Sequence, residues 1–406
     1  MNEPSTREAA DAMTLSYDPG SYEVQSDPFP IYRRLQDEAP LYHNTDMGFW
    51  ALTRFDDVIK GLGDHGALSS EQGTLIEQVQ SGNPPPDMMI FKDPPQHDVL
   101  RGLVNRAFTP RRIAELEGDV LAMCAQWLDP LVEQGGGDFV ADLAGVLPMA
   151  VIGRLLGAPS EDFPMLKALS DRLMHREDGS VAAPEDSAAA GLELFVYFND
   201  MVQARRATPD DALLSGLIDA ELPDADGGMR RLDDAELVMF CMLLGVAGNE
   251  TTSKLIATGV VALNDFPDER TRLAADPTLG PGAVEELLRY DPPSHYQGRV
   301  ATRDLEFHGQ VVEKGSIVLL VNGAANRDPR AFPEPERFIA DRKIARHLAF
   351  GHGVHFCLGA SLARLETRVA LQEIVARFPD YSVDKAGVER FHSSNVRGLS
   401  KVPFVA

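Results

Sequence analysis

The chain has 406 residues, with 38 Lys and Arg against 62 Asp and Glu, so its formal net charge is −24 at pH 7. This excess of acidic residues repels phosphate backbones and anionic lipid heads, which excludes nucleic acid and the anionic membrane surface as partners of the whole molecule. The composition, 44% hydrophobic and 25% charged, is that of a globular protein and excludes disorder, collagen and coiled-coil arrays.

Helical periodicity dominates the chain. Apolar residues recur at three- and four-residue spacing and predict helices over 113–132, 192–206, 234–265, 282–290 and 358–378. Short apolar runs predict strands, gathered in one minor sheet, at 49–52, 305–307, 317–321 and 402–405. Because the Gly- and Pro-rich pieces are short loops, we expect one mainly α domain over 1–406 with a small β-rich region, disordered over about the first 15 residues.

The cysteines and the hydropathy of the chain indicate in which cellular compartment the protein is expected. Cys124, Cys241 and Cys357 are an odd set without metal-ligand spacing, so neither a disulfide framework nor a zinc site is indicated and we expect a reducing compartment. The N-terminal sequence does not resemble a signal peptide. The longest apolar stretch, 237–248, is shorter than the roughly 20 residues of a membrane helix, so we expect a cytoplasmic protein without a membrane anchor.

The helix predicted over 234–265 is the longest. Asp233 and Glu236 form a capping-box pattern at its start, and its first half is apolar all round, which requires burial. Gly245 and Gly248 weaken the helix just before a polar run that begins at Asn249. Two interpretations stay open on this segment alone: a ligand contacts the helix at this point, or the helix leaves the core for solvent.

A second informative segment, 347–364, places Cys357 in a loop with Gly351, Gly353 and Gly359, immediately before a predicted helix. Backbone N–H groups exposed by glycine turns and the positive end of a helix both stabilise a thiolate. A metal-ligating sulfur requires this ionised form, so the surroundings favour a ligand over an inert buried thiol.

At these residues the sequence resembles the cytochrome P450 family. Six positions match its haem-binding signature: Phe350, Gly351, Gly353, His355, Cys357 and Gly359. Glu286 and Arg289 match the family's Glu-x-x-Arg helix, and Arg337 matches the later arginine of the same buried network. The resemblance covers nearly the whole chain and implies a triangular, mainly α single domain that binds haem b through Cys357 as the iron ligand.

The resemblance also assigns roles around the haem. It implies that the propionates bind His97, Arg101, Arg299 and His355. It likens 247–252 to the family's oxygen-binding groove, formed here by Ala247, Gly248, Glu250 and Thr251. Thr251 would hydrogen-bond bound oxygen and the water beside it, and Glu250 would help to deliver protons. Gly245 and Gly248 would let the cofactor or dioxygen approach the helix backbone.

The substrate pocket is implied in the same way. Its walls would come from four segments of the chain: Met88, Met89, Ile90 and Phe91; Leu243, Val246 and Ala247; Ser294, His295 and Tyr296; Asn395 and Val396. Most of these residues are apolar, so we expect a lipophilic substrate. Ser294 and His295 depart from the Val-Gln of many bacterial relatives, and His295 either brings a hydrogen-bonding group near the haem or faces the protein interior.

The resulting hypothesis is a haem-thiolate monooxygenase that inserts one atom of O2 into a lipophilic molecule, most often by hydroxylation. Since the sequence shows no dinucleotide fingerprint or iron–sulfur cysteine set, electrons would come from a ferredoxin and its reductase. The alternative is a haem-binding recruitment or ligand-binding module without turnover. We expect a monomer. The resemblance places two groups of basic residues on the face where the cysteine loop approaches the surface: Arg101, Arg106, Arg111 and Arg112, and then Arg342, Lys343 and Arg346. Since Arg101 is assigned to a propionate and Arg106 to the structure, we expect ferredoxin to dock on this face at exposed Arg111 and Arg112.

Overall fold

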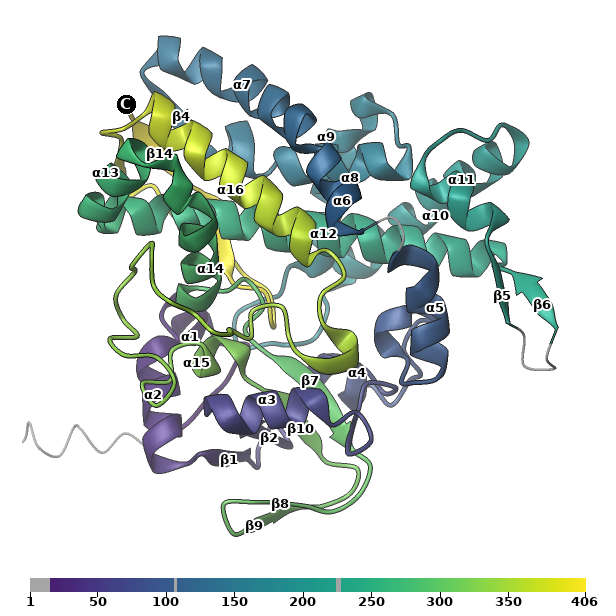
Figure 1. Ribbon diagram of the computed structural model, residues 1–406. Helices are drawn as coiled ribbons and strands as arrows, with labels where there is room; N and C mark the ends of the chain where they lie inside the picture. Colours follow the sequence, from purple (N-terminus) through teal and green to yellow (C-terminus); the bar gives the residue numbers. More distant parts are fainter. Residues whose placement is uncertain (1–14, 106–107, 224–227) are drawn as a thin grey trace, which may run out of the picture.

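The computed structural model describes residues 15–105, 108–223 and 228–406, so the first 14 residues, where we expected disorder, and Arg106 lie outside the described residues. The described chain is mainly helical, as predicted (Figure 1). Its α-helices are α1 (Tyr22–Ser26), α2 (Phe29–Glu38), α3 (Phe55–Gly63), α4 (Ile76–Gln80), α5 (Gln96–Asn105), α6 (Pro110–Glu115), α7 (Glu117–Gln134), α8 (Leu147–Leu156), α9 (Phe163–Met174), α10 (Glu185–Ala207), α11 (Leu213–Asp219), α12 (Asp234–Asp265), α13 (Pro267–Ala275), α14 (Gly280–Tyr290), α15 (Asn322–Ala325) and α16 (Ala360–Arg377). Short helical turns are η1 (Met89–Phe91), η2 (Val140–Ala144), η3 (Ser160–Asp162), η4 (Pro277–Leu279) and η5 (Gly353–His355).

The strands are short and form five separate sheets among the described residues. They are β1 (Leu41–Asn44), β2 (Phe49–Leu52), β3 (Leu68–Ser69), β4 (Gly136–Asp138), β5 (Glu221–Pro223), β6 (Met229–Arg231), β7 (Gln297–Ala301), β8 (Leu305–Phe307), β9 (Gln310–Val312), β10 (Ile317–Leu320), β11 (Ser382–Val383), β12 (Glu389–Phe391), β13 (Gly398–Lys401) and β14 (Pro403–Val405). The largest sheet has the order β1-β2-β10-β7-β3, and β2 and β10 pair in parallel with Phe49 opposite Ile317.

The prediction of one minor sheet is therefore wrong. Of the four predicted strands, β2 and β10 share the largest sheet, whereas β8 forms a hairpin with β9, and β14 joins β4 and β11. The helix predicted over 113–132 is divided at Leu116, where α6 ends and α7 begins. The remaining predicted helices have the expected positions, with ends that differ by a few residues apart from α10, which begins earlier, at Glu185.

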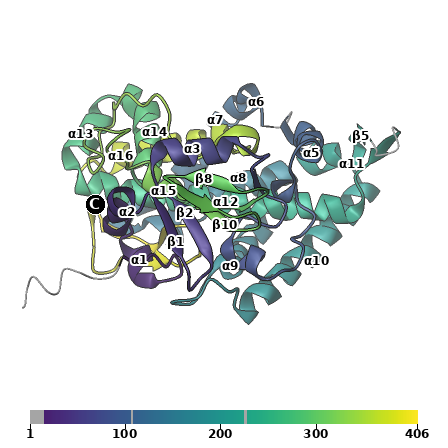
Figure 2. The same ribbon diagram turned by 90° about the horizontal axis from the view of Figure 1, so that it is seen from below.

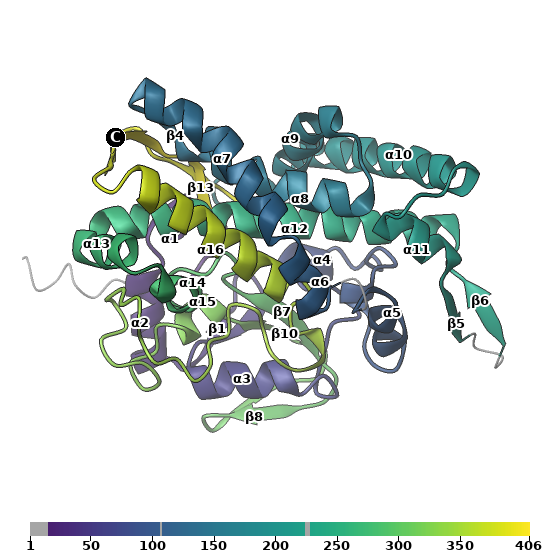
Figure 3. The same ribbon diagram turned by 45° about the horizontal axis from the view of Figure 1, so that its top comes forward.

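Helix α12 crosses the molecule, and the other long helices are arranged around it (Figures 1 and 3). Its predicted capping box is confirmed: the Glu236 amide donates to Asp233 Oδ1 at 2.8 Å, and the Asp233 amide donates to Glu236 Oε2 at 2.9 Å. Helices α8, α10 and α16 pack against it, and most of its residues from Leu237 to Leu263 are buried, as an apolar helix requires. Seen from below, the largest sheet lies in front of α12 (Figure 2).

The two glycines of α12 contact neighbouring helices, which we did not predict. A Cβ at Gly245 would lie 3.1 Å from Phe198 Cζ on α10, and one at Gly248 would lie 3.4 Å from Ile152 Cγ1 on α8. Close packing on α10 therefore accounts for Gly245, whereas the contact at Gly248 is an ordinary one and the role expected for Gly248 beside a cofactor stays a prediction. No helix among the described residues combines the length and hydropathy needed to span a bilayer.

Candidate haem site

The loop that carries Cys357 is shaped by its glycines and by one backbone hydrogen bond. The Cys357 amide donates to the Phe350 carbonyl at 2.9 Å, which closes the loop onto itself. Gly351 and Gly353 have φ of +68° and +73°, and a Cβ at Gly353 would lie 2.9 Å from the Leu62 carbonyl oxygen. A side chain at Gly353 would therefore be strained and would clash with α3. The loop ends at Gly359, the N-cap of α16.

The electrostatics of the thiol differ in part from our expectation. Burial raises the pKa of Cys357, while the Gly359 N–H, Arg101 and Arg364 partly offset that rise. The predicted donors are thus present, but burial outweighs them in the protein alone. A cation on the sulfur would supply the missing stabilisation, because a coordinated thiol is deprotonated by the metal's own charge.

The four residues assigned to the propionates lie close together beside this loop, and we call them the basic cluster. The rings of His97 and His355 are 4.4 Å apart between centroids, and Arg101 Nη2 donates to the Phe356 carbonyl at 2.5 Å. Arg299 and His97 both help to lower the pKa of His355, after burial itself. Residues from α5, β7 and the cysteine loop, far apart in sequence, thus form one group.

The basic cluster has the charge that a buried dianion needs. Arg299 is 4% exposed, and among the described residues its guanidinium donates one hydrogen bond, from Nη1 to the Gly298 carbonyl at 2.7 Å. Burial lowers the pKa of Arg299 to about 10, and the nearby charge of Asp93 opposes that shift only in part. A buried guanidinium without a hydrogen-bonded carboxylate is costly unless an anion joins it. The site therefore fits the two carboxylates of a haem.

Behind the loop lies a buried ion network. Arg289 and Glu286 are fully buried and form a bidentate pair, with Nε to Oε2 at 2.7 Å and Nη2 to Oε1 at 2.9 Å. Arg289 also donates to the carbonyls of Asn326 and Arg337, at 3.1 and 3.0 Å. The network therefore ties α14 to the segment that follows α15.

The assignment of the Arg337 side chain to this network is wrong. That side chain is 62% exposed and pairs with Glu334 at 3.2 Å; only its backbone carbonyl takes part. The arginine that reaches the network is Arg342, whose Nε donates to both carboxylate oxygens of Glu286 at 2.9 and 3.0 Å. The loop before Arg342 turns so that its side chain points inward, which removes Arg342 from the exposed basic group that we had predicted.

A second set of contacts, which sequence reasoning missed, clamps the ends of the cysteine loop. Glu285 accepts from Arg364 Nε at 2.5 Å and lies 3.1 Å from His347 Nε2. His347 precedes the loop and Arg364 lies one turn into α16. The only signal in the sequence is that Glu285 directly precedes Glu286, on a neighbouring face of the same helix.

The predicted acid and alcohol lie on consecutive positions of α12. Thr251 Oγ1 donates to the Ala247 carbonyl at 2.9 Å. Glu250 is 2% exposed; its Oε1 accepts from Asn249 Nδ2 at 3.1 Å and its Oε2 lies 3.3 Å from Lys254 Nζ. Burial raises the pKa of Glu250 to about 7. A carboxyl that titrates near neutrality can both hold and release a proton under working conditions.

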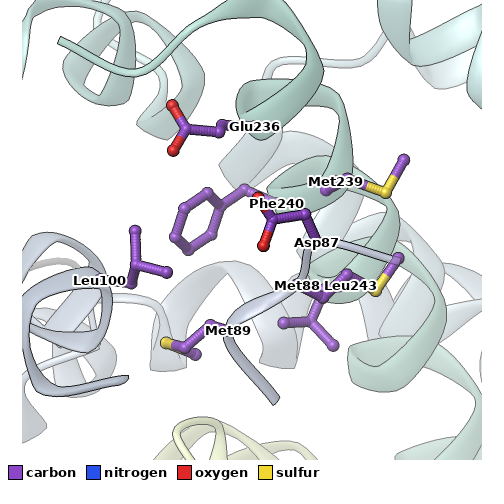
Figure 4. Close-up of a pocket in the computed structure, with 8 residues that line it drawn as sticks. All are labelled: Asp87, Met88, Met89, Leu100, Glu236, Met239, Phe240 and Leu243. Carbon is purple, nitrogen blue, oxygen red and sulfur yellow. The ribbon is translucent and has the colours of Figure 1, made fainter. Parts of the chain in front are cut away.

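Three of the predicted pocket residues, Met88, Met89 and Leu243, line one small pocket (Figure 4). Its other lining residues come from α5, α12 and the loop before η1: Asp87, Leu100, Glu236, Met239 and Phe240. The two carboxylates are neutralised by cations, Asp87 by Lys92 and Glu236 by Arg230. The remaining lining side chains are apolar, and three of them, Met88, Met89 and Met239, are methionines.

The other predicted pocket residues are placed differently. Val246 lines a separate pocket with residues of α8, α9 and α10, so its assignment to the pocket of Leu243 is wrong. Ile90 and Phe91 lie on η1, outside the lining of both pockets. Ser294 and Val396 form an antiparallel β-bridge, and the Asn395 carbonyl accepts from the His295 amide at 2.8 Å.

His295 and Tyr296 face the protein interior. His295 Nδ1 lies 2.9 Å from the Tyr32 hydroxyl, and its Nε2 lies 3.5 Å from Asp291 Oδ1. Tyr296 is fully buried in a core cluster that contains Tyr17 and Tyr32. Of the two interpretations left open for His295, the interior one is therefore correct, and neither side chain lines the pocket of Met88 and Leu243.

Comparisons with known proteins agree with this geometry. The sequence profile of the Cytochrome P450 family matches residues 279–395. The chain is 43% identical over 392 residues to cytochrome P450 123 of Mycobacterium tuberculosis, covering 96% of each chain, and 41% identical over 384 residues to the vitamin D(3) 25-hydroxylase of Pseudonocardia autotrophica, covering 93% of each. CYP109E1 from Bacillus megaterium, solved in complex with testosterone, has a TM-score of 0.85 at 31% identity, with 94% of this chain and 98% of that chain covered.

These similarities confirm the predicted fold and the predicted class of enzyme. They extend over almost the full length of both chains, which includes the loop of Cys357 and the helix of Thr251. The chain belongs to the cytochrome P450 family of monooxygenases and has the fold of its bacterial members.

Proposed function

We propose that this chain binds haem b through Cys357 and inserts one oxygen atom of O2 into a lipophilic small molecule, with hydroxylation as the expected outcome. The observation that carries the proposal is the position of Cys357 beside the basic cluster, where Arg299 is buried and poorly paired and would gain from an anion. A haem held by a thiolate supplies oxygen activation, because the sulfur donates electron density that favours O–O cleavage.

In this proposal each group of residues around the haem has its own role. Cys357 ligates iron, and Phe350, Gly351 and Gly359 shape the loop that presents it. His97, Arg101, Arg299 and His355 bind the propionates. Thr251 orients water and dioxygen through its hydroxyl, and Glu250 returns a proton to that water.

For the substrate we propose a lipophilic molecule that contacts Met88, Met89 and Leu243, on the evidence of their shared pocket. CYP109E1 binds testosterone and the relative from Pseudonocardia autotrophica is a vitamin D(3) hydroxylase, so steroids and secosteroids are the first compounds to titrate. Binding of such a ligand beside the haem would change the absorption spectrum of the ferric protein. A saturable change identifies the class, and no change across the panel would contradict it.

For the electron source we propose a ferredoxin and a ferredoxin reductase that draw on NAD(P)H, with the enzyme in the cytoplasm. The support is the exposed basic pair Arg111 and Arg112 on α6, a helix that packs against α16 just beyond the cysteine loop. An acidic partner would be attracted there in spite of the net charge.

The central test is the variant Cys357→Ser. It is expected to lose the carbon-monoxide absorption characteristic of thiolate-ligated haem, because an alcohol is a far weaker ligand than a thiolate. Cys124→Ser on α7, which removes another buried cysteine, is the matched control and keeps the spectrum. Retention of both spectrum and activity by Cys357→Ser would refute the proposal, and haem binding without NADH-dependent product formation by the wild type would favour the non-catalytic alternative.

A further inference from the structure

The side chain of Glu250 belongs to a chain of alternating charges that links α12 to α9. Glu250 Oε2 lies 3.3 Å from Lys254 Nζ, and Lys254 Nζ lies 3.7 Å from Asp171 Oδ1. Asp171 Oδ2 in turn accepts a hydrogen bond from Lys167 Nζ at 2.5 Å. The two carboxyls also influence each other electrostatically, since Asp171 raises the pKa of Glu250.

The inner pair of this network, Glu250 and Lys254, is more buried than the outer pair, Asp171 and Lys167. The side chains of Lys254 and Glu250 are 1% and 2% exposed, whereas those of Asp171 and Lys167 are 33% and 22% exposed. The chain therefore runs from the interior of the molecule, next to Thr251, to solvent at the surface of α9. The outer pair includes a carboxylate, Asp171, whose side chain is in contact with water.

Several oxygen atoms along this route have unused capacity for hydrogen bonds. Glu250 Oε2, Asp171 Oδ1, Asn249 Oδ1 and Ser253 Oγ are buried without a hydrogen-bond partner among the described residues. Buried acceptors of this kind bind ordered water inside proteins, and such water conducts protons between groups that do not touch.

Lys254 is held in place by apolar contacts. Its Nζ lies 4.0 Å from the centroid of the Phe391 ring on β12. Its stem packs on Gly398 of β13, where a Cβ would lie 2.3 Å from Lys254 Cβ. A buried lysine fixed in this way keeps a cation between two carboxyls and limits where their side chains can lie.

We propose that Asp171 is the solvent-side relay residue that reloads Glu250 with protons, and that Lys254 is the positioning residue that keeps the two carboxyls together. This inference rests on the proposed monooxygenase function. Asp171 takes a proton from solvent water and passes it to Glu250. Glu250 gives its own proton to the water beside Thr251 after rotating its side chain. One proton moves inward in each cycle, and both carboxyls regain their starting charge.

The ionisation of Glu250 supports this order of transfer. Burial raises the pKa of Glu250 to about 7; Lys254 and Lys167 lower it and Asp171 raises it. These groups, with neutral Asn249, are the polar and charged neighbours that α9 and α12 present to Glu250. The pKa of Asp171 is held low: burial alone would raise it, but Lys254 and Lys167 outweigh burial. The inner carboxyl therefore keeps the proton and the outer one stays ionised, ready to accept the next.

The first test measures the carboxyl itself and needs no turnover. Infrared spectra recorded against pH follow the band of protonated Glu250, which is assigned by its loss in Glu250→Gln. Asp171→Asn should lower the midpoint of that band by about one pH unit, and Lys254→Met should raise it by a similar amount, because the two neighbours act in opposite directions. Midpoints that stay unchanged in both variants would overturn the inference.

The second test measures proton delivery in the haem-loaded enzyme. Asp171→Asn should lower NADH-coupled product formation by about tenfold or more and increase the solvent isotope effect, with an unchanged carbon-monoxide spectrum and unchanged substrate binding. Asp171→Glu should restore both values. Asp186→Asn, which breaks the exposed pair between Asp186 and Arg172, the residue next to Asp171 on α9, is the matched control and should behave as wild type.

The outcomes separate this inference from the function on which it rests. Wild-type protein without a thiolate spectrum would refute the monooxygenase function, and the infrared midpoints would still decide whether Asp171 and Glu250 share protons. A normal spectrum with an isotope effect in Asp171→Asn equal to that of the wild type would refute the relay alone. Thr251→Ala should divert electrons to hydrogen peroxide while leaving the Glu250 midpoint in place.

Discussion

Arg337 and Arg342 lie five positions apart and show how strongly environment decides the role of a side chain. Arg342 is 10% exposed and donates to Glu286, whereas Arg337 is 62% exposed and pairs with Glu334. Replacing one partner of a buried pair leaves an uncompensated charge, while an exposed pair is screened by water. The side chain of Arg342 should therefore contribute much more to the free energy of unfolding than that of Arg337.

We expect Arg342→Ala to lower the free energy of unfolding by roughly 3 kcal/mol, because it deprives buried Glu286 of one of its two arginines. Arg337→Ala should cost about 0.5 kcal/mol or less, since its backbone carbonyl still accepts from Arg289. Urea unfolding of both variants measures the difference. Equal losses would contradict the placement of Arg342 in the network.

A pH-dependent contribution to stability is expected from Glu250. The folded protein keeps this proton up to about pH 7, whereas the unfolded chain releases it near the ordinary value of 4.5. Between these values the folded state binds more protons, so this group's contribution to stability falls as pH rises, by at most about 1.4 kcal/mol per pH unit.

The variant Glu250→Gln isolates that contribution. Burial lowers the pKa values of histidines such as His295 and His355, so their contribution to stability rises with pH. The wild type and Glu250→Gln share these histidines, so their contribution cancels in the comparison. The wild type should therefore lose stability relative to Glu250→Gln between about pH 4.5 and 7. Chemical unfolding at several pH values measures this difference, and parallel curves would show that Glu250 ionises normally.

At the scale of elements, local signals were predicted well and distant pairings were not. The capping box of α12 and the strand β2 involve neighbouring residues, so the sequence contains the information that places them. The pairing of β2 with β10 joins residues more than 250 positions apart, and the separation of β14 into another sheet depends on β4. Nothing in the alternation of apolar residues specifies such partners.

The site shows the same division. Cys357, Glu286 and Arg289 belong to short motifs and were found from the sequence. Asp171 and Lys254 were missed, because a single aspartate on α9 and a lysine on α12 give no signal until the helices pack together. The glycines of α12 were noticed, but their neighbours Phe198 and Ile152 could not be foreseen from spacing alone.

At the scale of the whole molecule, the positive charges are distributed by function. Arg289, Arg299 and Arg342 are turned inward, where they pair with Glu286 or belong to the basic cluster. Arg111 and Arg112 remain exposed on α6. They adjoin a surface groove between α6, α14 and α16, whose lining includes Pro110, Ile113 and Ser361 and two ion pairs, Arg364 with Glu285 and Arg368 with Glu117.

This groove lies next to the start of α16, the helix that follows Cys357, so a donor seated there would be near the cysteine loop. A molecule of net charge −24 repels an acidic ferredoxin at long range. A local group of positive charges is therefore needed to attract the ferredoxin and to orient it on the surface. Arg111 presents its charge at the surface, since it is 91% exposed and its pair with Glu115 is 3.6 Å long.

Reversing both charges, with Arg111→Glu and Arg112→Glu, should lower the apparent affinity for ferredoxin by about tenfold at low ionic strength and flatten its salt dependence. Substrate binding should not change, because neither side chain lines the pocket of Met88 and Leu243. The control reverses Arg33 and Arg34, two adjacent arginines on α2 whose i,i+4 partners are Asp37 and Glu38, on a different side of the molecule (Figure 1). Stopped-flow reduction of the ferric protein measures the rates, and equal rates for the two double variants across a range of salt would place the docking site elsewhere.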